Sequence, residues 1–199
     1  LQDPLAELVK IDPKGIGIGQ YQHDMKQARL DEALGGVVES CVNAVGVDIN
    51  TASYSLLSYI AGINQTAAKN IVKYREENGA FTTRGQVTKV PRIGAKAFQQ
   101  CAGFLRVPGG REALDNTGVH PESYDCARRL LSMFGYSEAD IANGGLTGLR
   151  QKVVRKGVQS VCEALEVGEP TLADIITELE KPGRDIREGF DAPVLREDV

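Results

Sequence analysis

Apolar residues recur at helical spacing along most of the chain, and runs with strand-like alternation are scarce. After a short apolar piece at 5–11 and a Gly-rich loop at 12–20, the first half predicts helices at 34–47, 53–60, 66–77, 82–90 and 95–104. The second half predicts helices at 122–134, 137–142, 146–156, 160–165 and 171–180. Asn78-Gly79 provides a stop signal after one of them. The pattern therefore predicts an all-α fold class.

Pro and Gly residues divide this series of helices into parts. Pro108, Gly109 and Gly110 together break the helical pattern, and we interpret them as a boundary between two parts of the chain. The segment 181–199 is charged, contains two prolines and lacks periodicity, so it is expected to be an extended linker.

Composition narrows the class of protein. The 199 residues carry a net charge of -4, with ordinary hydrophobic and charged fractions of 42% and 25%. The longest apolar runs are only a few residues, so no membrane span and no membrane partner are expected. The four cysteines are far apart, without CxxC spacing, which favours reduced thiols in a cytoplasmic protein over a metal or redox site.

The modest net charge hides an asymmetry along the chain. Residues 60–107 contain eight basic and two acidic residues, a net charge of +6. Residues 108–199 contain 11 basic and 17 acidic residues, a net charge of -6. Such a separation indicates different roles for the two halves, and the alternative is that the charged runs are simply solvated helix faces.

Two stretches repeat one pattern about thirty residues apart. Leu57 and Ile60 precede the turn Gly62-Ile63-Asn64, and Val87 and Val90 precede the turn Arg92-Ile93-Gly94. Each turn is followed by a helix that carries a lysine, Lys69 or Lys96. The pattern resembles the helix-hairpin-helix motif, whose usual turn is Gly-apolar-Gly.

The chemistry of such a hairpin favours phosphate binding. Successive backbone N–H groups lie next to the N-terminus of the second helix, where unpaired donors and the helix dipole attract an anion. The apolar residue of the turn is expected to enter the core. The candidate nucleic-acid-binding residues are therefore the two turns and the basic residues beside them: Gly62, Ile63, Asn64, Gln65, Lys69, Arg92, Ile93, Gly94, Ala95 and Lys96.

Both turns depart from Gly-apolar-Gly. Asn64 replaces the second Gly of the first turn and tolerates left-handed geometry. Arg92 replaces the first Gly of the second turn, so that hairpin is expected to be distorted, although the Arg92 side chain could reach a phosphate.

Longer stretches resemble one family. VKIDPKGIGIGQYQHDM, VVESCVNAVGVDINTAS, LDNTGVHPESY and LEKPGRDIREGF look like the Tex family of bacterial transcription accessory proteins. The resemblance implies that residues 1–34 are a connector or the tail of an RNase H-like domain. It also implies that 35–107 is a tandem helix-hairpin-helix domain, that 108–190 is a second domain of related type, and that 191–199 leads toward an S1 domain.

Two functions remain open at this point. The first is a non-catalytic module of a transcription accessory factor that binds the DNA or RNA backbone without sequence specificity. The second is an architectural or protein-interaction module for RNA polymerase or sibling domains. No enzyme activity, cofactor or metal is expected, since His23 and His120 stand apart from the cysteines and the Gly15-Ile16-Gly17 run lacks the spacing of a nucleotide-binding loop. A monomer is expected.

Overall fold

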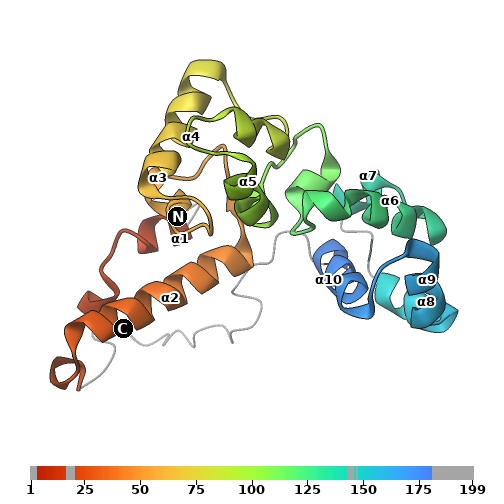
Figure 1. Ribbon diagram of the computed structural model, residues 1–199, viewed down its shortest axis with the longest axis horizontal. Coiled ribbons are helices and arrows are strands. Elements are labelled where there is room, and N and C mark those ends of the chain that lie inside the picture. Colours follow the sequence, from red (N-terminus) through yellow and green to blue (C-terminus); the bar gives the residue numbers. More distant parts are fainter. Residues whose placement is uncertain (1–3, 17–20, 143–145, 147, 181–199) are drawn as a thin grey trace, which may run out of the picture.

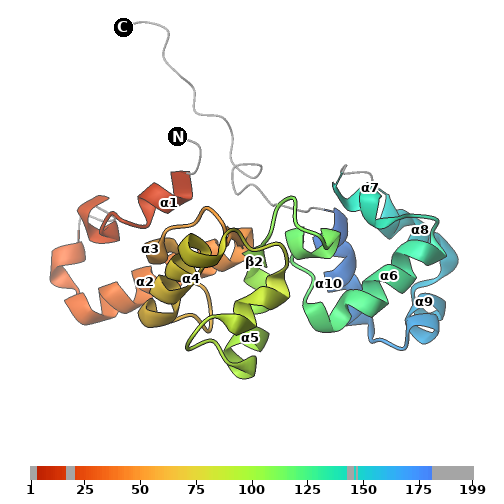
Figure 2. The ribbon, with the colours of Figure 1, turned by 90° about the horizontal axis from the view of Figure 1, so that it is seen from above.

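The computed structural model describes residues 4–16, 21–142, 146 and 148–180. Part of the expected Gly-rich loop, at 17–20, and the whole expected linker at 181–199 lie outside the described residues. Figures 1 and 2 show helices α1 to α5 at one end of the molecule and α6 to α10 at the other. No helix in the described ranges has the length and apolar character that a membrane crossing requires.

Among the described residues, the first half consists of five helices and short connecting turns. They are α1 (Pro4–Leu8), α2 (Gln27–Val45), α3 (Tyr54–Leu57), α4 (Gln65–Asn78) and α5 (Ala95–Cys101), with 3-10 turns at Pro13–Ile16, Gln22–Asp24, Arg84–Lys89 and Ala102–Phe104. Two strands, β1 (Val47–Asp48) and β2 (Leu105–Arg106), pair in parallel with Val47 opposite Leu105. This short pair ties the start of the tandem region to its end.

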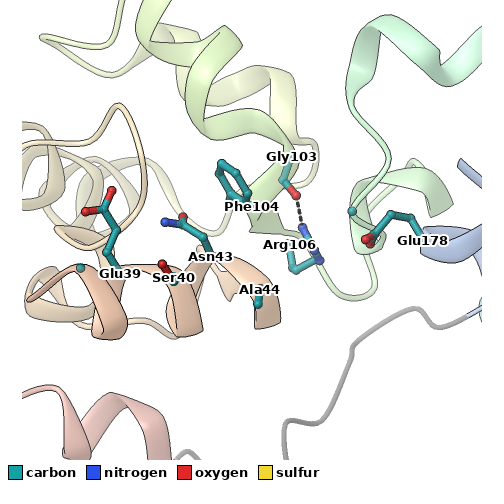
Figure 3. A pocket seen from close by; sticks show the side chains of 10 residues that line it. Glu39, Ser40, Asn43, Ala44, Gly103, Phe104, Arg106 and Glu178 are labelled. Carbon is teal, nitrogen blue, oxygen red and sulfur yellow. Dashed lines mark hydrogen bonds between the residues drawn. The ribbon is translucent and has the colours of Figure 1, made fainter. Parts of the chain in front are cut away.

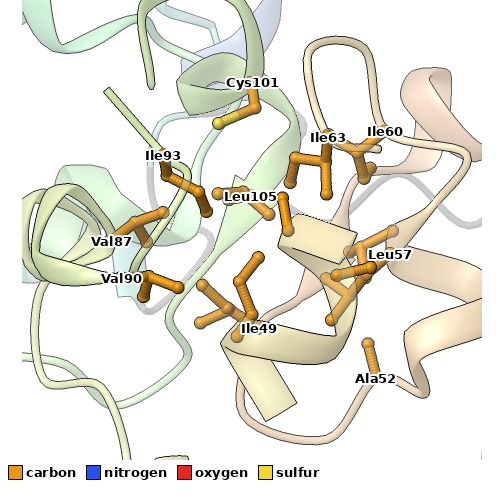
Figure 4. Close-up of a cluster of buried hydrophobic side chains, with 14 of the residues drawn as sticks. Ile49, Ala52, Leu57, Ile60, Ile63, Val87, Val90, Ile93, Cys101 and Leu105 are labelled. Carbon is orange, nitrogen blue, oxygen red and sulfur yellow. The ribbon is translucent and has the colours of Figure 1, made fainter. Parts of the chain in front are cut away.

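A single apolar core joins the two predicted hairpins. Ile63 and Ile93 are 3% exposed, and both pack in the cluster that contains Ile49, Leu57 and Leu105. Figure 4 shows the Ile63 and Ile93 side chains reaching this cluster from opposite sides. The apolar residue of each turn therefore enters the core, as the motif predicts.

Five further helices lie in the part of the second half that the structure describes. They are α6 (Tyr124–Met133), α7 (Glu138–Ala142), α8 (Leu149–Lys156), α9 (Val158–Leu165) and α10 (Glu169–Glu180), preceded by 3-10 turns at Ala113–Asn116 and Pro121–Ser123. Their apolar faces meet in a separate core that includes Leu130, Leu149, Val161 and Leu172. The predicted all-α class, a tandem hairpin region followed by a second helical unit, is confirmed.

Several element limits differ from the predicted ones. Helix α2 begins at Gln27 rather than at residue 34, because its first turns are mostly exposed and carry no apolar period for the sequence pattern to detect. The limit placed between residues 34 and 35 therefore falls inside this helix. Helices α3 and α5 end earlier than expected, at Leu57 and Cys101, since short turns of tighter geometry follow them.

The junction at Pro108 is packed rather than open. The N–H of Arg111 donates to the Thr82 carbonyl (2.8 Å), and the N–H of Val107 donates to the Asp115 carbonyl (3.0 Å). The buried guanidinium of Arg84 donates to the Val119 carbonyl (2.8 Å). The start of the second half is thus hydrogen-bonded into the first.

Candidate nucleic-acid interface

The first hairpin is a tight turn that leads directly into α4. Gly62 has φ +82°, and the N–H of Ile63 closes the turn on the Ile60 carbonyl at 3.0 Å. Asn64 is the N-cap of α4, and its side-chain oxygen accepts a hydrogen bond from the N–H of Ala67 (2.9 Å). Asn64 thus caps the helix instead of adopting the left-handed conformation, which Gly62 provides.

The second hairpin repeats this arrangement despite its different residues. Arg92 occupies the left-handed position with φ +73°, and the N–H of Ile93 closes on the Val90 carbonyl at 3.1 Å. Gly94 is the N-cap of α5, with no side chain to cap the helix. The expected distortion is therefore absent: the chain accepts the strained conformation at Arg92, a residue that disfavours it.

Both turns leave backbone donors available. In the described ranges, no hydrogen bond satisfies the N–H groups of Gly62, Asn64, Gln65 and Thr66 in the first hairpin, or those of Arg92, Gly94, Ala95, Lys96 and Ala97 in the second. All of these residues except Ala97 are exposed. The N–H groups of Ile63 and Ile93 are already used inside the turns, so these two predicted site residues act through packing alone. Thr66 and Ala97 are donors that sequence reasoning missed.

Positive side chains border both turns. Lys69, Arg92 and Lys96 are exposed, and no ion pair of the described residues includes them. The ammonium of Lys69 lies 5.6 Å from the centre of the Tyr54 ring. The structure thus places all the predicted charged residues at the two turns, with their charge available to an anion.

The two hairpins are packed against each other's helices. A Cβ at Gly62 would lie 2.8 Å from Cβ of Gln100 on α5, so only glycine fits there. In the other direction, the Asn70 side chain on α4 donates to the Pro91 carbonyl at 2.9 Å. These two contacts fix the spacing between the two groups of free amides. Asn70 was not among the residues predicted from the sequence.

Two turns of the second half resemble the hairpins in backbone conformation but differ in chemistry. Gly135 (φ +73°) and Glu166 (φ +60°) occupy left-handed positions before Tyr136 and Val167. The N–H groups of Tyr136 and Val167 return to the preceding helices, at the Leu131 and Cys162 carbonyls. The Ser137 N–H is taken by the Asp140 carboxylate at 2.7 Å, so the first of these turns lacks the free donors of the hairpins.

A polar cleft of about 740 Å³ lies between α2, β2 and α10. Figure 3 shows Glu39, Ser40 and Asn43 on one side and Arg106 and Glu178 on the other. The Arg106 guanidinium donates to the Gly103 carbonyl at 2.6 Å, and burial lowers the pKa of Arg106 to about 10.

Two of the polar side chains that line this cleft, those of Asn43 and Arg106, are hydrogen-bonded to backbone groups of the fold. Asn43 donates to the Tyr59 carbonyl and accepts from the N–H of Ala61. No histidine lines the cleft beside Ser40. Nowhere in the described ranges does a group of three or more His, Cys, Asp or Glu side chains lie close enough to hold a metal ion.

Comparison with protein families matches both halves. Residues 42–106 match the helix-hairpin-helix motif, and residues 112–187 match a domain described as HHH domain. The first match begins on α2 and ends on β2, so it covers the two hairpins and their shared core. The second match covers the helices from α6 to α10.

Curated relatives extend the match over the whole chain. The chain is 53% identical over 199 residues to the transcriptional accessory protein Tex of Neisseria gonorrhoeae, and 53% identical over 200 residues to the protein tex of Bordetella pertussis. It is 38% identical to the human S1 RNA-binding domain-containing protein 1. All of this chain is covered in each comparison, but it spans only 26%, 24% and 25% of these relatives.

Proposed function

The chain belongs to the Tex family of transcriptional accessory proteins, and we propose that it is a non-catalytic module with a role in transcription. In this proposal the module binds the sugar-phosphate backbone of nucleic acid. The two hairpins hold phosphates through backbone N–H groups, and Lys69, Arg92 and Lys96 add electrostatic attraction. Contacts to phosphate carry no base information, so binding is independent of sequence.

One observation carries the proposal. Two exposed turns, held at fixed spacing, present free backbone donors at the N-termini of α4 and α5, in the part of the chain with net charge +6. Free amides at a helix N-terminus favour an oxyanion ligand. Two findings support nucleic acid as that ligand: the matches to helix-hairpin-helix regions, and the human relative that is named for an S1 RNA-binding domain.

The test is a binding titration against single-stranded and double-stranded DNA and RNA at low salt. Non-specific contacts of this kind give dissociation constants of about 10⁻⁴–10⁻⁶ M. We expect Lys69→Glu and Lys96→Glu each to weaken binding and to reduce its salt dependence. Lys73→Glu is the matched control, because Lys73 is exposed on the same helix as Lys69 but lies near Glu77 (3.6 Å). Unchanged binding in both hairpin variants would remove the assignment.

The reciprocal packing of the hairpins favours a second candidate function. Gly62 against Gln100, and Asn70 against Pro91, show that the turns also hold the domain together. The module would then be architectural, with RNA polymerase or sibling domains of the longer relatives as partners. Absence of any mobility shift in the low-salt titration, for all four nucleic acids, would favour this candidate.

A further inference from the structure

The second half of the chain is acidic, and three of the four arginines between residues 112 and 180 lie beside carboxylates. Residues 112–180 contain twelve acidic and six basic residues. Arg128 pairs with Glu112 and Glu138, Arg129 lies 3.8 Å from Glu166, and Arg150 lies 3.6 Å from Glu180. Half of the basic residues therefore sit beside carboxylates.

The other three basic residues gather on one helix. They are Lys152, Arg155 and Lys156 in the last two turns of α8, all exposed. No ion pair in the part of the chain that the structure describes includes any of them. Positions three and four apart share a helix face, so the three charges lie on one surface. Within residues 112–180, which contain twice as many acidic as basic residues, this surface of α8 therefore carries three unpaired positive charges.

Aromatic rings hold two of these ammonium groups in place. The Lys152 Nζ atom lies 4.0 Å from the centre of the Tyr136 ring, and the Lys156 Nζ atom lies 5.5 Å from the centre of the Phe134 ring. Both rings belong to the turn between α6 and α7. A cation over a ring face is attracted by the ring quadrupole and keeps its charge. The lysines are therefore positioned in advance without being neutralised.

The helix dipole explains only part of this arrangement. Arg155 and Lys156 lie in the last turn of α8, where positive charge is favourable. Lys152 lies a full turn earlier, and its contact is with a ring of another element. The dipole thus accounts for the sign of the last charges but not for the placement of Lys152 over Tyr136.

The neighbouring turn determines how a ligand would be held. Its N–H groups at Gly135, Tyr136 and Ser137 already donate to Ser132, Leu131 and Asp140. A ligand at this surface is therefore contacted by side chains rather than by backbone amides. Since the lysines lie over the rings, the covered ring faces do not serve as stacking platforms for bases.

We propose that Lys152, Arg155 and Lys156, held against Tyr136 and Phe134, form a second nucleic-acid surface that binds backbone phosphates through side chains alone. The ligand class rests on the proposed function, but the surface is separate from the two hairpins. Each lysine contacts one phosphate and thereby releases about one counterion from the nucleic acid. The surface enlarges the footprint on the nucleic acid and adds no sequence preference.

The experiment compares double variants of the same chain. Lys152→Glu with Lys156→Glu is measured beside Lys69→Glu with Lys96→Glu, against a 30-nucleotide single strand and a duplex of about the same length at several salt concentrations. Lys10→Glu with Lys73→Glu makes the same change in net charge at two exposed lysines that lie beside Glu7 and Glu77. Circular dichroism verifies that each variant is folded.

For the α8 variant we expect about tenfold weaker binding at low salt, and a salt slope smaller by about 1.5. The control pair should change the affinity by about twofold or less. Loss in the α8 variant with no loss in the hairpin variant would support this surface and contradict the hairpin assignment. Weaker binding in the hairpin variant alone would overturn the present proposal. An acidic peptide is titrated in parallel, and weaker binding of this peptide to the α8 variant, with unchanged binding of nucleic acid, would also overturn it.

A second measurement avoids charge reversal. Gln151 is exposed on α8, next to Lys152 and one turn before Arg155. A photo-crosslinking residue at this position, in an otherwise unchanged chain, should join to a labelled oligonucleotide, and excess salt should suppress the product. Crosslinking from the hairpin position Gln65 without any from Gln151 would also overturn the proposal.

Discussion

Arg84 and Asp115 meet at two points, although one belongs to each half of the chain. The N–H of Arg84 donates to a carboxylate oxygen of Asp115 at 2.6 Å, and the Arg84 guanidinium donates to the Asp115 carbonyl at 3.0 Å. The same guanidinium reaches the carbonyls of Thr117 and Val119. The Arg84 side chain is fully buried, and this burial lowers its pKa.

Replacement of Arg84 should therefore test the junction. Arg84→Met removes the guanidinium group, which donates hydrogen bonds to three buried carbonyls. It also removes a positive charge that interacts with the buried Asp115 carboxylate. Because three buried carbonyls lose their donors, we expect a loss of about 3–5 kcal/mol in the free energy of unfolding. Urea denaturation measures it. Arg111→Met, at an exposed position nearby, should change stability by about 0.5 kcal/mol or less. Equal effects of the two substitutions would contradict the role given to Arg84.

This junction also shows what the sequence could not predict. The hairpins are visible in the sequence because Ile63 and Ile93 must enter a core, and helical spacing around them indicates how. Arg84 carries no such signal, since an isolated arginine usually lies at the surface. The Pro108-Gly109-Gly110 breaker correctly marks a turn, but the hydrogen bonds that cross it depend on tertiary contacts.

The turns of the second half show a different limit. Glu166-Val167-Gly168 has the same residue pattern as Arg92-Ile93-Gly94, and both first residues adopt positive φ. Residue pattern alone does not reveal which turn keeps free donors. The difference lies at the first residue of each turn: the N–H of Glu166 donates to the Glu163 carbonyl, whereas the N–H of Arg92 finds no partner in the described residues.

Substitution at Gly62 should be far more damaging than at an open glycine. Gly62→Ala combines a positive φ with a Cβ placed 2.8 Å from Cβ of Gln100 and 3.0 Å from the Ala97 carbonyl. Gly135→Ala has a similar φ, but nothing lies within 4 Å of its new Cβ. We expect a cost of about 1–2 kcal/mol at Gly135 from conformation alone, and a clearly larger cost at Gly62. Thermal unfolding of both variants measures the difference.

Arg92→Gly should separate stability from binding. Glycine relieves the left-handed conformation at φ +73°, which favours a gain of about 1 kcal/mol in the free energy of unfolding. The same change removes a charge at the second hairpin, so affinity for nucleic acid should fall. A higher melting temperature together with weaker binding is the expected result. Weaker binding together with lower stability would indicate that the Arg92 side chain has a structural contact.

Loss of the Asn64 cap should weaken the first hairpin locally. Asn64→Ala removes the acceptor for the N–H of Ala67 and should lower the free energy of unfolding by about 1 kcal/mol. Asn64→Gly should lower it by only roughly a few tenths of a kcal/mol. Amide hydrogen exchange at the start of α4 measures the effect. Equal protection in the two variants would contradict the capping role.

The buried thiol of Cys101 should make stability depend on alkaline pH. Burial raises the pKa of Cys101 from 9.0 to about 11. The unfolded chain therefore loses this proton near pH 9, while the folded chain retains it until about pH 11. Stability contributed by the protonated thiol is complete below pH 9 and declines between these values, by at most about 3 kcal/mol.

Comparison with Cys101→Ala isolates this contribution. The substitution costs stability near pH 8, because Cys101 is fully buried in the core. The gap between the unsubstituted chain and the variant should narrow between pH 9.0 and about 11, the interval between the unfolded and folded pKa of Cys101. Cys41→Ala, at an exposed cysteine, should leave the alkaline decline in place. Urea denaturation at each pH measures the three proteins, and a gap that stays constant with pH would show that the Cys101 proton is not linked to folding.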